Sequence, residues 1–561
     1  MTYIDWIVVI AWVVGTSAFG FSFRRHVKST RDYLLAGRRL RWWQIAMAQS
    51  ADAVDATDFV ATTGHGFRTG ASQVGFAWWG MGIGSLLLSR YITPLLYRTG
   101  VYTNAEYLAL RYTPSLRIAS AVLQMLYRFV AMALVVYAMA TMFKVIVGMD
   151  LWYGVWAAMI LTLIYVFASG QLGVVMAAIP QMILMMVTSI LIFAGATMEF
   201  GGWDGFQEHA PALGDLLHLA GHEEPGVPGG VYLWGLILTL VTYPIVNQTV
   251  AQRIVGARSE MDARKGTVAS LLPWFLITGI STAVGIMGIV LLPELRTGDP
   301  DHAFPKYMVR YLTAMGPGVL GLGVAALVVA SISTGAGIGT AIAGLMTRDV
   351  LGYSSEKESA DRKYLWLTRI FACLSIVCGT MFAMAIPYFE GMLPFYVALT
   401  GTFFLPLTVP YIGGALYRRA SRGSGMASLV AGVGVGSILF FGDWFKFLPA
   451  ELAHPQCRPF LVLEASFLAF FGWSMIENRI RGPVPQTDLA SMLNSFDLGK
   501  AADPDEVKKM IQSPRLASWQ GKEEVDHERL GIPKNIAWYA HPTTFEVAAI
   551  VLLIVLMIWW W

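Results

Sequence analysis

The chain has 561 residues, of which 56% are hydrophobic and only 14% are charged, and its mean hydropathy is +0.56. Soluble domains carry roughly 25% charged residues, so this composition excludes an ordinary soluble protein. The net charge of +3 gives no case for nucleic-acid binding, and the sequence has neither a phosphate-cradling loop nor a His/Glu metalloprotease pattern. We therefore expect a membrane protein that is not an enzyme and that draws no energy from ATP.

Apolar segments of roughly 20 residues, the length that crosses a bilayer, recur along the whole chain. The second segment is the weakest by hydropathy because it contains three aspartates, but leaving it out would invert every later loop. About 14 spans are predicted, at 3–23, 42–67, 71–97, 118–147, 151–169, 172–198, 231–254, 266–293, 316–346, 364–388, 393–417, 424–447, 459–478 and 544–561.

Loop charge indicates which way these spans face. If the N-terminus is outside, the first inner loop, 24–41, contains seven Lys and Arg residues, and the inner loops 253–265, 348–363 and 418–422 are also basic. The long outer loop 199–230 has no Lys or Arg. This asymmetry follows the positive-inside rule. We expect a multi-pass protein of the inner cell membrane with both termini outside.

Three aspartates, Asp52, Asp55 and Asp58, stand in the stretch "SADAVDATDF" of the second span. A charge at the bilayer centre costs at least a few kcal/mol, so such residues face a partner, water or the bundle interior. On a continuous helix the three would lie within about 120° of arc. The stretch is also rich in small residues, and a backbone that leaves the helix inside a membrane lines a cavity. Loosened carbonyls beside a carboxylate would bind a small cation; the alternative is aspartates paired with Arg or hydroxyl groups for packing alone.

Two further polar features lie inside predicted spans. Ser331, Ser333, Thr334 and Thr340 stand among Gly and Ala residues of the ninth span, where they serve either close helix packing or cation binding. Arg128 lies well inside the fourth span and needs a partner, for which the aspartates are candidates. A structural ion pair is favoured there over a bidentate grip on a carboxylate solute.

Five stretches together resemble motifs of the sodium/solute symporter family, the relatives of sodium/proline and sodium/glucose transporters. They occur in the right order over most of residues 31–432, and the last 80 residues carry no such resemblance. The stretches are "DYLLAGRRLRWWQIAMAQSAD", "NAEYLALRY", "NQTVAQRIVGARSEMDARKG", "MTRDV" and "GTFFLPLTVPYIGGALYRRASRGSGMASLVAG".

The resemblance implies an all-α integral membrane protein with a LeuT-type fold, in which two inverted repeats of five helices form the core. One extra helix would precede the core and about three would follow it. The polar segment 479–543 contains six prolines and is predicted to be a cytoplasmic linker. The resulting division is an N-terminal helix at 1–30, a symporter core at 31–423, extra helices at 424–478, the linker at 479–543 and a terminal helix at 544–561.

The resemblance also implies a sodium site at a break in the first core helix, completed by the eighth core helix. Asp55 falls where proline-type members carry an aspartate beside this sodium. The family's ligand positions fall on the backbone carbonyls of Ala53 and Ala56 and on Ala330, Ser333 and Thr334. Many members have an Asp in the fifth core helix for a second sodium, but Ile179 stands there, so one sodium per cycle is expected.

The expected function is therefore import of a small polar solute, coupled to inward flow of sodium by alternating access within a lipid bilayer. Three acids against one Arg point to a cationic or zwitterionic solute, and the family's sugar-binding set is absent. Two alternatives stay open: proton coupling through Asp55 or Asp52, and a solute sensor whose tail signals to an unknown protein partner. The predicted solute contacts are Asp52, Asp58, Trp79, Arg128 and Gln248.

Overall fold

The computed structural model describes most of the chain, and within the described part it contains helices and no β-strand. Most of the predicted linker, 483–535, lies outside the described residues, and so do 214–228 of the long outer loop. Eight of the described helices are long and apolar enough to cross a membrane. The described residues are 1–23, 27, 29–168, 171–213, 229–296, 298–352, 358–389, 392–449, 457–482 and 536–560.

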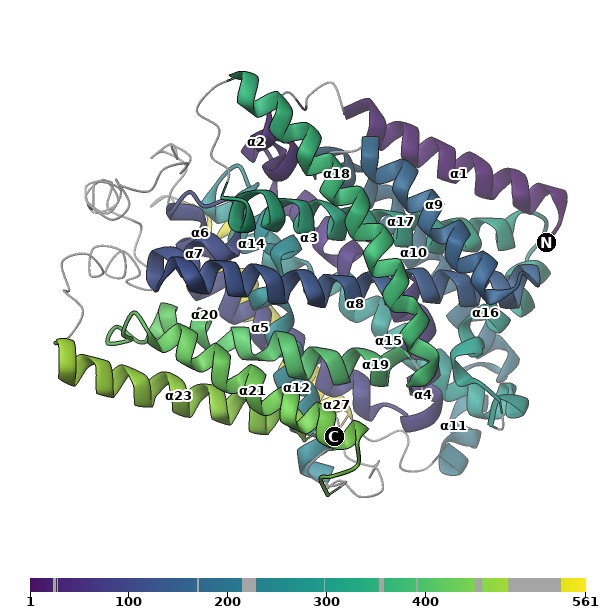
Figure 1. Cartoon of the computed structure of the whole chain (residues 1–561). Helices are drawn as coiled ribbons and strands as arrows, with labels where there is room; N and C mark the ends of the chain where they lie inside the picture. The colour runs from purple at the N-terminus through teal and green to yellow at the C-terminus, as the bar shows by residue number, and fades with distance from the viewer. Residues whose placement is uncertain are drawn as a thin grey trace.

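Ten of the predicted spans each contain one long helix, and α8, α21 and α23 among them run close to the horizontal in Figure 1. They are α1 (Tyr3–Ser22), α8 (Pro114–Val147), α9 (Leu151–Ala168), α10 (Gln171–Glu199), α15 (Leu271–Leu291), α17 (Val319–Gly344), α18 (Glu358–Phe382), α21 (Ser424–Trp444), α23 (Arg458–Arg481) and α27 (Pro542–Trp560).

In the other four predicted spans the α-helix is divided, by a non-helical break in the second and seventh spans and by π- or 3-10-helical turns in the third and eleventh. Asp55 caps the second half of the second span, and the Asn247 side chain accepts a hydrogen bond from the Thr249 amide, 2.8 Å, to cap the second half of the seventh. Both residue types hydrogen-bond to nearby backbone, which ends one helix and begins the next. The interrupted pairs are α3 (Trp42–Ala53) with α4 (Ala56–Thr69), α5 (Ser72–Leu87) with α6 (Thr93–Arg98), α12 (Gly229–Val246) with α13 (Gln248–Val255), and α19 (Met392–Leu399) with α20 (Thr408–Leu416).

Short helices collect at the two ends of the bundle. The basic end, which lies to the left in Figure 1, contains α6 together with α2 (Thr30–Leu35), α7 (Asn104–Arg111) and α14 (Glu260–Ala269). The opposite end contains the N-terminus, α11 (Gly202–Leu213) and α16 (Ala303–Tyr307). The basic end includes several of the loops in which the sequence concentrates Arg and Lys.

Buried charges at the basic end are matched with each other. Arg98 donates through Nε and Nη2 to the two carboxylate oxygens of Glu260, each at 2.8 Å. Glu106 is fully buried and receives Arg117 at 3.1 Å and Arg348 at 3.0 Å. These residues belong to, or lie next to, the stretches that carry the family resemblance, so here the motifs serve the packing of loops against helix ends.

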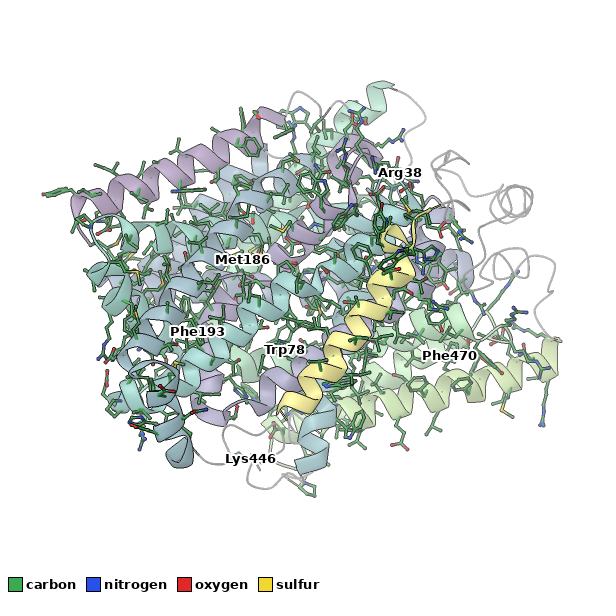
Figure 2. All side chains as sticks on the ribbon, turned by 180° about the vertical axis from the view of Figure 1, so that it is seen from behind. Arg38, Trp78, Met186, Phe193, Lys446 and Phe470 are labelled. Carbon is green, nitrogen blue, oxygen red and sulfur yellow. The ribbon has the colours of Figure 1, made fainter. Side chains whose placement is uncertain are left out.

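The last helix, α27, is shown in yellow in Figure 2, where it crosses the back of the bundle diagonally. Its Glu546 is buried and accepts hydrogen bonds from Arg264, 2.7 Å, and Ser89, 3.0 Å. The neighbouring ring of Phe545 meets the edge of Trp42 at the start of α3, with 5.6 Å between centroids. A charge placed in an apolar helix therefore fixes this helix to the basic end.

Candidate functional site

The site is built around the break between α3 and α4. Val54 has an extended backbone (φ −125, ψ 106), and the Asp55 side chain caps α4 by accepting the Thr57 amide at 2.6 Å. In an unbroken helix that amide would donate to the carbonyl of Ala53. The break therefore releases a carbonyl inside the bundle. It also means that the three aspartates do not share one continuous helix: Asp52 belongs to α3, Asp55 is the cap, and Asp58 belongs to α4.

Helix α17 packs against this break. The Thr334 hydroxyl donates to the carbonyl of Ala51 at 3.2 Å, and the Ser333 hydroxyl donates to the carbonyl of Ala330 at 3.1 Å. Ala56, Ala330, Ser333 and Thr334 are all buried, and Ala53 is half-buried. Two hydroxyls thus lie on the helix that faces a loosened backbone, and carbonyl and hydroxyl oxygens are the ligands that hard cations prefer. Among the described residues no cluster of His, Cys, Asp and Glu could hold a metal instead.

A cavity of about 170 Å³ lies beside the break and is lined by residues of both halves of the broken helix. All three aspartates line it, together with Arg128 from α8 and Thr334 from α17. Most of the remaining wall is apolar or aromatic. The cavity therefore brings part of the predicted cation site, Ala53, Asp55 and Thr334, together with all three charged residues that were predicted to bind the solute.

The charges in this cavity have different partners. Asp52 forms an ion pair with Arg253, which belongs to α13 and is fully buried. Arg128 was the predicted partner of the aspartates, which is wrong for Asp52. Arg253 lies at the end of a predicted span, where an arginine is expected to belong to a loop. Among the described residues no acidic side chain forms an ion pair with Arg128, and its buried Nη2 has no hydrogen-bond partner. Asp58 is half-buried and lines the cavity.

Aromatic side chains hold Arg128 in place. Its guanidinium carbon lies 5.2 Å from the centre of the Tyr127 ring, a cation–π distance. That ring stacks on Phe404, with centroids 3.8 Å apart, and its hydroxyl lies 3.1 Å from the hydroxyl of Tyr396. The cavity is also lined by Tyr127, Tyr243, Trp274 and Tyr396, which no sequence pattern singles out because aromatic residues are common throughout the spans.

Two residues that the sequence assigned to solute binding do not line this cavity. Trp79 is half-buried, and its neighbour Trp78 instead lies close to the site, donating to Thr278 at 2.9 Å. Gln248 is fully buried and accepts a hydrogen bond from the Asn104 amide at 2.9 Å. Gln248 thus joins α13 to α7 at the basic end.

The amino-acid sequence is similar to a described family and to characterised transporters. The model of the sodium:solute symporter family matches residues 33–432. A sodium/glucose cotransporter of Vibrio parahaemolyticus is 24% identical over 446 residues, which cover 76% of this chain and 81% of that protein. Sodium-coupled monocarboxylate transporter 2 of Bos taurus is 25% identical over 479 residues, covering 81% of this chain and 76% of that protein.

Two solved structures have a similar fold. A substrate-bound, outward-open sodium-coupled sialic acid symporter aligns with a TM-score of 0.71 at 16% identity, over 85% of this chain and 98% of that one. Mhp1, a nucleobase-cation-symport-1 family transporter in a closed conformation, aligns with a TM-score of 0.54 at 13% identity, over 80% and 95%. Both are LeuT-fold transporters, which confirms the predicted fold.

Proposed function

The chain belongs to the sodium:solute symporter family, and from this premise we propose that it imports a small polar organic solute together with one sodium ion per cycle. Membership of the family makes it a multi-pass membrane transporter, not an enzyme, and a sodium-coupled symporter. The observation that carries the finer proposal is the shared cavity, which the loosened end of α3, the cap of α4 and the hydroxyl of Thr334 all line.

Sodium would bind between the broken helix and α17. The carbonyls of Ala53 and Ala56 and the oxygens of Ala330, Ser333 and Thr334 would hold it, because all belong to the two segments that meet at the break. The Thr334 hydroxyl already reaches the end of α3. Asp55 would act on the ion through its charge, since its carboxylate lies in the same cavity. Sodium supplies a positive charge that draws α3, α4 and α17 together.

A single sodium is proposed because the position at which many family members carry an aspartate for a second sodium is apolar here. Ile179, on α10, stands where other members have an aspartate, and its side chain offers no oxygen. A transporter with this arrangement would move one positive charge for each neutral solute. Reconstituted protein should therefore take up sodium and solute in a ratio of one to one.

Coupling between sodium and solute would depend on the contacts that hold α3 against α13 and α14. Its start donates from the Trp42 amide to Asp262 Oδ1 at 3.0 Å, and its other end carries the Asp52–Arg253 ion pair. Opening toward the basic end requires α3 to part from α13 and α14. A sodium ion that bridges α3 and α17 would oppose that movement, and release of the ion would permit it. The coupling free energy between ion binding and opening would thus drive alternating access.

The solute would bind in the cavity, against Asp58 and Arg128. Asp52 also lines it but is neutralised by Arg253, so we assign it to closure of the basic end. The orientation that fits the loop charges places the basic end in the cytoplasm and both chain termini outside, in the inner cell membrane. The lipid bilayer is then the only partner that the proposal requires besides ion and solute.

Uptake into proteoliposomes tests the proposal. A panel of radiolabelled amino acids, sugars and carboxylates is offered with an inward sodium gradient, with an inward proton gradient, or with neither. We expect at least one solute to accumulate with the sodium gradient alone. Accumulation that ignores sodium and collapses with the proton gradient would replace sodium by protons as the coupling ion.

A further inference from the structure

The charges that line the cavity identify the kind of solute that it fits. Of its four charged side chains, Asp52 is neutralised by Arg253, and Asp55 is the cap beside the proposed sodium. Asp58 and Arg128 remain, and among the described residues they form no ion pair with each other or with a third group. One negative and one positive group therefore face the same cavity without neutralising each other.

Unmatched charges inside a membrane protein are costly, and the cost falls when a partner of opposite charge arrives. The buried Nη2 of Arg128 has no hydrogen-bond partner. Its guanidinium is held over the ring of Tyr127, which is itself fixed by Phe404, so the fork is presented in one orientation. A fixed guanidinium with a free edge fits a planar carboxylate, which accepts two parallel hydrogen bonds.

Asp58 supplies the other half of the recognition. It belongs to the first turn of α4, is half-buried and lines the cavity, whereas Asp52 and Asp55 are buried. A primary, secondary or quaternary ammonium group would satisfy it, and the cavity wall adds the aromatic faces of Tyr243 and Trp274, which attract cations.

We infer that the solute is a small zwitterion, with its carboxylate on Arg128 and its cationic group on Asp58. This inference rests on the proposed transport function and names its substrate class. A solute with only a carboxylate would leave Asp58 unmatched, and a solute with only a cationic group would leave Arg128 unmatched. An uncharged sugar would leave both Asp58 and Arg128 without a partner of opposite charge. The cavity of about 170 Å³ has room for a zwitterion of the size of an amino acid or betaine.

Two reciprocal variants test this pairing. Thermal stabilisation of the purified protein in sodium is measured with L-amino acids and betaines, and with analogues of each that lack one charge: the amide, which keeps the ammonium group, and the hydroxy acid, which keeps the carboxylate. Wild-type protein should be stabilised by at least one zwitterion and by neither of its analogues. Asp58→Asn should weaken zwitterion binding by roughly 10- to 100-fold and bring the hydroxy acid to similar affinity. Arg128→Gln should weaken zwitterion binding to a similar extent and bring the amide to similar affinity.

The control is Asp150→Asn, an exposed aspartate at the start of α9 whose loss should leave this selectivity unchanged. Stabilisation by a sugar or a simple carboxylate, with both variants unaffected, would overturn the zwitterion while leaving sodium-coupled transport in place. Stabilisation by none of the zwitterions would also overturn it. Absence of sodium-driven uptake for every class in the liposome panel would instead contradict the proposed function.

Discussion

Two regions of this protein bury charged side chains, and they treat them differently. At the basic end, Arg98 meets Glu260 with two hydrogen bonds, and Glu106 receives two arginines. At the helix break, Asp58 and Arg128 line one cavity without pairing. In the first region the buried charges neutralise each other and stabilise the fold. In the second they stay unpaired, as in a binding site without its ligand. The contrast separates motif residues that support the fold from residues that we propose bind the solute.

The largest expected effect tests that contrast directly. Glu260→Gln removes the buried carboxylate that accepts two hydrogen bonds from Arg98, which should lower the free energy of unfolding by about 3–5 kcal/mol. Asp58→Asn removes a charge that forms no ion pair among the described residues, so the free energy of unfolding should stay unchanged or rise. Denaturant titration in mixed micelles measures both. Equal destabilisation by the two variants would remove the distinction between the regions.

A smaller effect concerns Asp301, at the end opposite the basic end. Burial raises the pKa of its carboxyl to about 6, although it accepts a hydrogen bond from Arg68 at 3.1 Å. Because the folded-state pKa exceeds that of the unfolded chain, the carboxyl favours folding below about pH 4, and this contribution is lost as the pH rises through about 6.

Between pH 4 and pH 7.5 the stability of Asp301→Asn should therefore rise relative to wild type by roughly 2.5 kcal/mol, because about 1.4 kcal/mol per pKa unit gives about 3 kcal/mol in total and part of this is already lost at pH 4. Unfolding midpoints of the two proteins at each pH measure the difference. A difference that stays constant with pH would show that Asp301 is charged at pH 4 and above in the folded protein.

The anchor of the last helix should be weaker than the Arg98–Glu260 pair, because Arg90, one of its partners, is more than one-third exposed. Glu546→Gln should cost about 1.5–3 kcal/mol. The loss should appear as faster hydrogen exchange in α27. Glu294→Gln is the matched control, since that side chain is exposed, pairs with half-exposed Lys306 and should contribute less than about 1 kcal/mol. Unchanged exchange in α27 would mean that apolar packing alone holds the helix.

The smallest effect concerns helix packing. A Cβ on Gly285 of α15 would clash with the carbonyl of Thr63 on α4, so Gly285→Ala should cost about 1–3 kcal/mol. Gly434→Ala, on α21, meets no atom within 4 Å and should cost nothing. Thermal unfolding of the two variants provides the comparison, and a loss at Gly434 as large as that at Gly285 would contradict it.

The sequence predicted the fold well because its signals are local. Each span is indicated by about 20 apolar residues, and the break at Asp55 is indicated by small residues around a carboxylate that can cap a helix. The partner of Asp52 could not be predicted, because Arg253 is distant in the chain and lies at the end of a span, where an arginine is ordinary. The wall of Tyr127 and Tyr396 was missed for a similar reason, since hydropathy does not distinguish an aromatic ring that faces a cavity from one that faces lipid.

The central claim is that one sodium ion binds between the broken helix and α17. Equilibrium binding of radioactive sodium to the purified protein tests it, in wild type, in the double variant Ser333→Ala with Thr334→Ala, and in Ser331→Ala, a buried hydroxyl on the same helix. The account predicts one saturable site per chain in wild type and in Ser331→Ala, and affinity at least about tenfold weaker in the double variant. Undiminished binding in the double variant would contradict it.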